Sequence, residues 1–154
     1  MKLLIKSLCI AFVLTVIYSV IPFQAECEQI STEVFRLHIL ANSDSEEDQA
    51  LKLKVRDALL EYTDELFDDA KDRNDAENIA KENIETLQSV AQNTVYKNGC
   101  NYTVNAEVVK MYFNTRYYEN YTMPAGMYDA LRITIGSGKG HNWWCVMFPS
   151  ICIS

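Results

Sequence analysis

The hydrophobic pattern of this chain changes period twice, and the order of those changes restricts the fold more than any other feature. Residues 33–40 alternate apolar and polar side chains, residues 46–66 repeat apolar side chains every three or four positions, and residues 103–113 alternate again. Alternation is typical of a half-buried strand, whereas the wider spacing is typical of an amphipathic helix. We therefore expect a strand, then helices, then further strands.

The first predicted strand places its apolar and basic side chains on opposite faces. Phe35, Leu37 and Ile39 would face a core. Arg36 and His38 would point the other way, because successive side chains of a strand alternate between the two faces of a sheet. The pattern thus predicts a polar-facing side that carries these two basic residues.

Two helices are expected after this strand. The first should begin near Ser45, because Ser45 followed by Asp48 resembles a helix N-terminal cap. A second helix should run from Ala76 to about Gly99, a residue typical of helix C-termini. The inward residues of the first helix share apolar side chains at helical spacing: Leu51, Val55, Ala58, Leu59, Tyr62 and Leu66.

Three more strands are expected in residues 103–113, 129–135 and 143–148, with a tyrosine-rich loop over residues 114–126. Residues 136–140 are rich in glycine and lie between the last two strands, which predicts a hairpin. Because strands and helices are segregated along the chain, the predicted class is α+β. We expect two helices packed on a mainly antiparallel sheet of about four strands, in a single domain over residues 30–154.

The N-terminus has the pattern of a targeting segment. Lys2 and Lys6 precede an uncharged apolar run, residues 8–21, which is typical of a secretory signal peptide, so residues 1–25 are interpreted as one. Phe23 would occupy a position before the cleavage site where a small side chain is preferred. An uncleaved membrane anchor, with membrane contact through residues 3–23, therefore stays open as the alternative.

Charge and cysteine content extend this interpretation. The net charge of −7 offers no surface that would neutralise phosphates, so nucleic acid is not an expected partner. Disulfides persist outside the cytosol, and four cysteines follow the apolar run. Cys145 and Cys152 are the candidate pair, because Pro149 between them can reverse the chain. The alternative is that all four cysteines are reduced and buried.

Few residue patterns suggest chemistry. The two histidines are far apart, and the cysteines lack the spacing of a zinc site, so neither a metal nor a cofactor is expected. One enzymatic alternative remains, an exported cell-envelope hydrolase. It would use Asp44 with His38, or Asp129 with His141, as general acid and base.

Aromatic side chains are concentrated in residues 112–121 and at Trp143 and Trp144. Tyrosine and tryptophan are frequent at binding hot spots, because they combine a large rigid area with a polar group. The cluster therefore indicates either a contact surface or a cover over one edge of a small sheet. Trp143 and Trp144 should point to opposite faces of their strand.

Four motifs, in order, resemble the stage II sporulation protein R family. They are VFRLHILANSD at residues 34–44, LKLKVRD at 51–57, PAGMYDALR at 124–132 and GSGKGHNWWCVMFP at 136–149. The resemblance covers residues 33–152. Members of this family are exported signalling proteins made in the forespore of endospore-forming bacteria.

The resemblance implies a function as an activator rather than an enzyme. It implies secretion from the forespore into the space between the forespore and mother-cell membranes. There the protein would activate a membrane-embedded sporulation aspartic protease, which processes the precursor of sigma factor E. The residues expected to contact this partner are Arg36, His38, Asn42, Asp44, Arg132, His141, Asn142 and Trp143.

Overall fold

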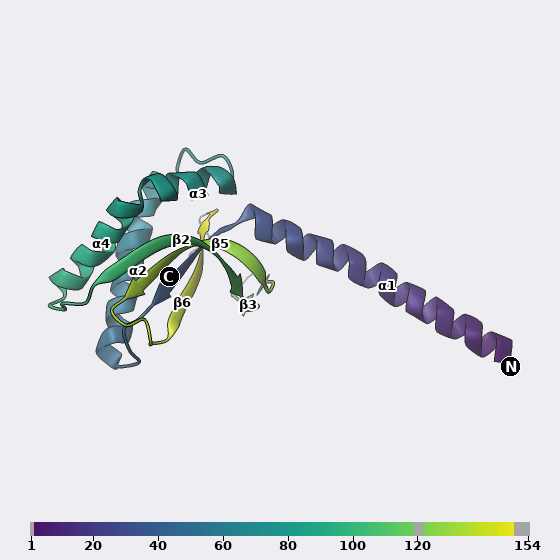
Figure 1. Ribbon diagram of the computed structural model, residues 1–154. Coiled ribbons are helices and arrows are strands. Elements are labelled where there is room, and N and C mark those ends of the chain that lie inside the picture. Colours follow the sequence, from purple (N-terminus) through teal and green to yellow (C-terminus); the bar gives the residue numbers. More distant parts are fainter. Residues whose placement is uncertain (1, 119–121, 150–154) are drawn as a thin grey trace.

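The computed structural model describes residues 2–118 and 122–149, and for residues 20–28 it describes the backbone alone. A long N-terminal helix precedes an α+β domain, which confirms the predicted fold class (Figure 1). The helices are α1 (Lys2–Glu33), α2 (Glu46–Leu66), α3 (Arg73–Glu82) and α4 (Ile84–Lys97). The strands are β1 (Phe35–Leu40), β2 (Val104–Phe113), β3 (Arg116–Tyr117), β4 (Thr122–Met123), β5 (Gly126–Ile135) and β6 (Asn142–Phe148).

Within the described residues, the main sheet has four strands in the order β2-β5-β1-β6. β1 is parallel to β5 and antiparallel to β6, and β2 is antiparallel to β5. The prediction that the last two strands form a hairpin is therefore wrong, because β1 lies between β5 and β6. Nearly every residue of β1 is buried, as befits a strand covered on both faces in the centre of a sheet.

The helices α2, α3 and α4 lie on one face of the sheet (Figure 1). The core on this face joins Leu37 and Ile39 of β1 to Leu131 of β5 and Val55 of α2, all fully buried. These are the inward positions that the two periodic patterns predict. Truncating a buried leucine such as Leu131 to alanine typically costs about 2–5 kcal/mol, which shows how strongly this core specifies the fold.

The second predicted helix is divided into α3 and α4 at Asn83. Asn83 ends one helix and precedes the other, with backbone angles φ −105° and ψ 16°. Its side-chain amide donates a hydrogen bond to the carbonyl of Ile79 at 2.9 Å. Asparagine often interrupts helices in this way, because its short polar side chain competes for backbone hydrogen bonds. The apolar spacing continues across the break, so periodicity alone does not reveal it.

The opposite face of the sheet carries a second apolar cluster. Phe113, Tyr128 and Val146 are fully buried there, and Met123 of the small β3–β4 sheet packs against them. The region expected to be only a loop therefore contributes part of this cover. As a result, the polar-facing side predicted for β1 does not exist: Arg36 is 0% exposed and His38 is 3% exposed.

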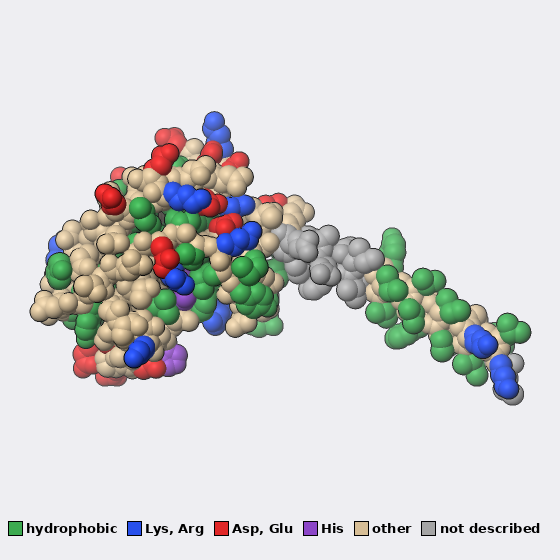
Figure 2. All heavy atoms as spheres, in the orientation of Figure 1, with side chains coloured by type: hydrophobic (Ala, Val, Ile, Leu, Met, Phe, Trp, Pro, Cys, Tyr) green, Lys and Arg blue, Asp and Glu red, His purple; other side chains and the backbone are tan. Residues whose placement is uncertain are grey.

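The first part of α1 is mostly apolar, and Lys2 and Lys6 are the charged residues within Lys2–Ser19. Lys2–Ser19 is long and apolar enough to cross a membrane, and none of it is buried in the structure. Figure 1 shows α1 projecting away from the domain, and Figure 2 shows hydrophobic side chains over its N-terminal part. A signal peptide has the same properties, so this helix is compatible with either a signal or an anchor.

Candidate functional site

Two loops from distant parts of the sequence contact each other at one end of the sheet. Residues 41–45 connect β1 to α2, and residues 136–141 connect β5 to β6. The hydroxyl of Ser137 donates to the Asn42 carbonyl at 2.7 Å, and the Gly140 amide donates to the Ala41 carbonyl at 2.9 Å. We refer to residues 41–45 and 136–141 together as the loop pair. Two of the four family-like motifs thus form one structural unit.

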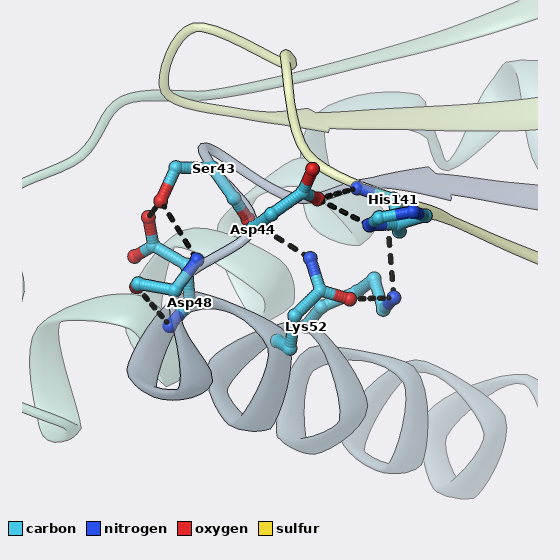
Figure 3. Close-up of polar contacts among 7 residues, drawn as sticks. Ser43, Asp44, Asp48, Lys52 and His141 are labelled. Carbon is cyan, nitrogen blue, oxygen red and sulfur yellow. Dashed lines mark hydrogen bonds and ion pairs between the residues drawn. The ribbon is translucent and has the colours of Figure 1, made fainter.

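The side chains of Asp44 and His141 contact each other on the solvent side of the loop pair, and they form an ion pair when the imidazole is protonated (Figure 3). The Asp44 carboxylate accepts from the backbone amide of His141 at 2.6 Å and lies 2.5 Å from the ring nitrogen Nδ1. Their side chains are 55% and 78% exposed, respectively. A pair this exposed contributes little to stability. Its groups are instead available to a binding partner.

Asp48, in the first turn of α2, organises the other side of the loop pair. Its carboxylate accepts hydrogen bonds from the Ser43 hydroxyl at 2.5 Å and the Asn42 amide at 2.8 Å. Burial alone would raise the pKa of Asp48, but hydrogen bonds from Ser43, Asn42 and Tyr102 lower it below its ordinary value. The Asp48 amide donates to Ser45 Oγ at 3.2 Å, which confirms the predicted helix start.

Lys52 of α2 holds the loop pair in place by a hydrogen bond, a role that was not predicted from the sequence. Its ammonium donates to the His141 carbonyl at 3.0 Å and to Gln49 Oε1 at 2.6 Å. The residue is 5% exposed, and burial lowers the pKa of its ammonium group. The sequence does contain a sign of this role. One face of the helix, at three-and-four spacing, carries the charged residues Asp48 and Lys52 followed by the apolar Val55 and Leu59. The two charged residues therefore lie in line with the apolar face that packs on the core.

Two glycines are required by close approach between the loops. A Cβ atom at Gly140 would lie 2.1 Å from the Ser43 carbonyl oxygen, and one at Gly136 would lie 2.4 Å from Asn42 Oδ1. Gly136 also has φ +57°, a conformation that favours glycine. The glycine-rich segment is therefore a packed structure, and not the hairpin tip that the sequence suggests.

A second group of candidate residues lies on the opposite face of the sheet from the helices. Arg36 stacks over Phe113, with 4.1 Å from its guanidinium carbon to the ring centroid, and it donates to the Tyr118 hydroxyl at 3.1 Å. His38 stacks on Trp144 with ring centroids 4.1 Å apart. These two predicted contact residues are thus enclosed by aromatic side chains.

Burial changes the ionisation of both basic residues on this face. Burial lowers the pKa of Arg36 below its ordinary value and lowers the pKa of His38 to about 4. The nearby side chain of Asn142 raises the His38 pKa in part, and the positive charges of Arg132 and Arg36 lower it. Neither ring nitrogen of His38 has a hydrogen-bond partner within the described part of the chain. His38 is therefore neutral near pH 7.

The other predicted contact residues lie beside these two groups. Arg132 is register neighbour to His38 and forms an ion pair with Glu107 at 2.6 Å. Asn142 begins β6 and is exposed. Trp143 points to the helix side, where the guanidinium carbon of Arg56 lies 4.4 Å from its ring centroid. The loop pair therefore unites only Asn42, Asp44 and His141 of the eight.

Neither Asp–His pair expected for a hydrolase is formed. Asp44 contacts His141 instead of His38, and Asp129 pairs with Arg73 at 2.7 Å. The described side chains contain no cluster of three or more His, Cys, Asp or Glu that could hold a metal ion.

The predicted bridge between Cys145 and Cys152 stays a prediction. Cys152 lies outside the described residues, and no two cysteines whose side chains the structure describes are joined to each other. Of the other two cysteines that follow the apolar run, Cys100 is a free thiol. The side chain of Cys27 is among those that the structure does not describe.

The fold and the site define a small α+β domain that follows an apolar helix and presents a fixed, charged loop surface to solvent. Residues 31–154 match the family of stage II sporulation protein R, and the chain belongs to this family. It is 38% identical over 123 residues to stage II sporulation protein R of Bacillus subtilis (strain 168). That alignment covers 80% of this chain and 55% of the relative, so the chain spans about half the relative's length. No solved structure matches. Family membership supports a role in sporulation signalling.

Proposed function

We propose that this chain is an exported signalling protein that activates a membrane-embedded aspartic protease during sporulation. The activated protease cleaves the precursor of sigma factor E in the mother cell. The family match over residues 31–154 carries this proposal. The apolar helix Lys2–Ser19 supports export from the forespore into the space between the two membranes, with or without retention as an anchor.

Activation requires that the chain bind the active arrangement of the protease more tightly than the inactive one. Each tenfold shift between the two arrangements takes about 1.4 kcal/mol of differential binding. The loop pair is suited to such contact, because the Asp44 and His141 side chains are exposed, while the His141 carbonyl accepts from buried Lys52 and the His141 amide donates to the Asp44 carboxylate. A surface ordered in advance avoids the entropy cost of ordering on binding.

The proposal is tested by expressing the chain, the protease and the sigma factor E precursor together in a bacterium that does not sporulate. We expect cleaved precursor on immunoblots only when all three are present. Asp44→Ala and His141→Ala should each reduce cleavage about tenfold, which corresponds to about 1.4 kcal/mol of lost binding.

The matched control is Asp57→Ala. Asp57 is also exposed and ion-paired, with Arg56 at 2.6 Å, but it lies on α2 outside the loop pair. Cleavage should stay near the wild-type level in this variant. Cleavage without the chain would contradict the proposal, and so would release of soluble fragments from peptidoglycan by the purified chain, which would favour the hydrolase.

A further inference from the structure

β2 is an outer strand of the main sheet, and one half of its free edge is closed by α4. The amide of Val104 donates to Gln92 Oε1 at 2.8 Å, and the amide of Ala106 donates to Gln88 Oε1 at 3.1 Å. These two amides therefore point away from β5, the neighbouring strand. Glutamine side chains take the place of a further strand along this half of the edge.

The other half of the edge is open. The register between β2 and β5 is continuous from Val104 to Phe113, so the outward direction recurs at every second residue. The amides of Val108, Lys110 and Tyr112 therefore also point away from β5. No backbone or side-chain group in the described ranges accepts a hydrogen bond from these three amides. The side chains of Lys110 and Tyr112 are exposed.

We propose that residues 108–112 of β2 bind an extended segment of a partner protein as an additional strand. Outward amides and carbonyls recur there about every 6.7 Å, twice the rise per residue of a strand, and an extended backbone matches this spacing. Strand addition of this kind uses main-chain hydrogen bonds for affinity and side-chain pockets for specificity. The partner follows from the proposed function, on which this step rests. The added strand is an extended segment in the extracytoplasmic part of the membrane-embedded protease.

The side chains beside the open edge define what the segment should carry. Tyr112 is 57% exposed, and its cross-strand neighbour Met127 is 47% exposed, so together they offer an apolar contact. Lys110 is on the same face. Its cross-strand neighbour Asp129 pairs with Arg73, and no carboxylate of the described residues lies within ion-pair distance of Lys110. The matching segment has an acidic and an apolar side chain two residues apart, because alternate side chains share a face.

A second copy of this chain is a poorer match for the same edge. Antiparallel overlap of residues 108–112 with themselves places Lys110 opposite Lys110, and like charges in directly opposed positions are destabilising. The opposite outer strand, β6, is shorter, with seven residues. Its pairing with β1 has a register shift at Phe35 and Arg36, an irregularity of the kind that blunts sheet edges.

The inference is tested by amide hydrogen exchange on the full chain, alone and with the protease in lipid nanodiscs. In the free chain, the amides of Val108, Lys110 and Tyr112 should exchange fast, while those of Val109 and Met111, which face β5, should exchange slowly. Binding should slow the three outward amides at least about tenfold, since each gains a hydrogen-bond acceptor. Unchanged exchange of these amides in the bound chain would overturn the inference.

A pair of variants at Lys110 separates the backbone from the side chain. Lys110→Pro removes the outward amide, and proline is tolerated where a strand's N–H faces solvent. Lys110→Ala keeps that amide and removes only the charge. Precursor cleavage should fall about tenfold or more with Lys110→Pro, and by clearly less with Lys110→Ala, with both proteins retaining the wild-type circular dichroism spectrum.

The outcomes distinguish this inference from the proposed function. If the wild-type chain does not stimulate the protease, the proposed function fails, and the assignment of the partner fails with it. If the wild-type chain stimulates cleavage but the two variants behave alike and the outward amides stay unprotected, only the strand addition is refuted. Protection of these amides in the free chain that increases with its own concentration would show self-pairing and also overturn the inference.

Discussion

At the scale of single residues, the largest departure from expectation is the burial of Arg36 and His38. Their alternation with apolar neighbours is the ordinary pattern of a strand with one face exposed to solvent. The groups that cover them, such as Phe113, Tyr118 and Trp144, are 75 or more residues away in the sequence. Period-two patterning identifies which side chains share a face, but it carries no information on what distant segment covers that face.

Buried His38 should make stability depend on pH. Burial lowers its pKa to about 4, below the ordinary value of 6.5. Between these values the unfolded chain binds a proton that the folded chain excludes, so stability falls as the pH is lowered through this window. The stabilisation is fully present above pH 6.5 and is lost by about pH 4. It amounts to at most about 3 kcal/mol.

Urea unfolding of wild type and His38→Phe at pH 7.5 and pH 4.5 checks this prediction. Phenylalanine keeps a ring against Trp144. Protonation of carboxylates lowers the stability of both proteins by similar amounts, so this effect largely cancels when the two are compared. The wild type should lose more stability than the variant on acidification. Parallel losses in the two proteins would show that His38 is not the group responsible.

At the scale of elements, α2 and the four strands of the main sheet were predictable because each has a strong local pattern, whereas β3 and β4 lie in a segment expected to be a loop. The helix start at Ser45 follows from its capping residues, and the inward face of α2 follows from its spacing. The partner of each strand was not predictable in this way. A glycine-rich connection between two strands predicts a hairpin. In the structure, however, β1, which comes much earlier in the chain, lies between β5 and β6 and pairs with both.

The loop pair gives a prediction at this scale. Gly140→Ala places a Cβ atom 2.1 Å from the Ser43 carbonyl oxygen, so the two loops must separate. We expect a loss of about 1–3 kcal/mol in unfolding free energy, the usual cost of overpacking. The change should also reduce precursor cleavage, because Asp44 and His141 would no longer be held together.

Gly126→Ala is the control for the loop-pair variant. Its added Cβ would meet its nearest neighbour, a ring carbon of Tyr128, at 3.5 Å, an ordinary contact. Thermal or urea unfolding should show a change within about 0.5 kcal/mol of wild type. If both glycine variants unfold alike, close approach is not the reason for glycine at position 140.

At the scale of the whole molecule, the sequence identified the parts of the site but not their assembly. Motifs around Asn42 and Asp44 and around His141 were singled out, and the structure brings them into one unit. The roles of Asp48 and Lys52 were missed, because a charged residue on an amphipathic helix usually indicates a solvated face. Only the tertiary structure shows that both are buried and hydrogen-bonded across the loop pair.

The central claim is that this chain acts by binding to a protease and not by cleaving a substrate itself. The most direct measurement combines purified chain, protease in lipid nanodiscs and sigma factor E precursor, with the chain titrated at constant protease. The cleavage rate should rise and saturate as the chain fills the protease sites, and the chain without protease should leave the precursor intact. A precursor cleaved by the chain alone, or a rate independent of the chain, would contradict the account.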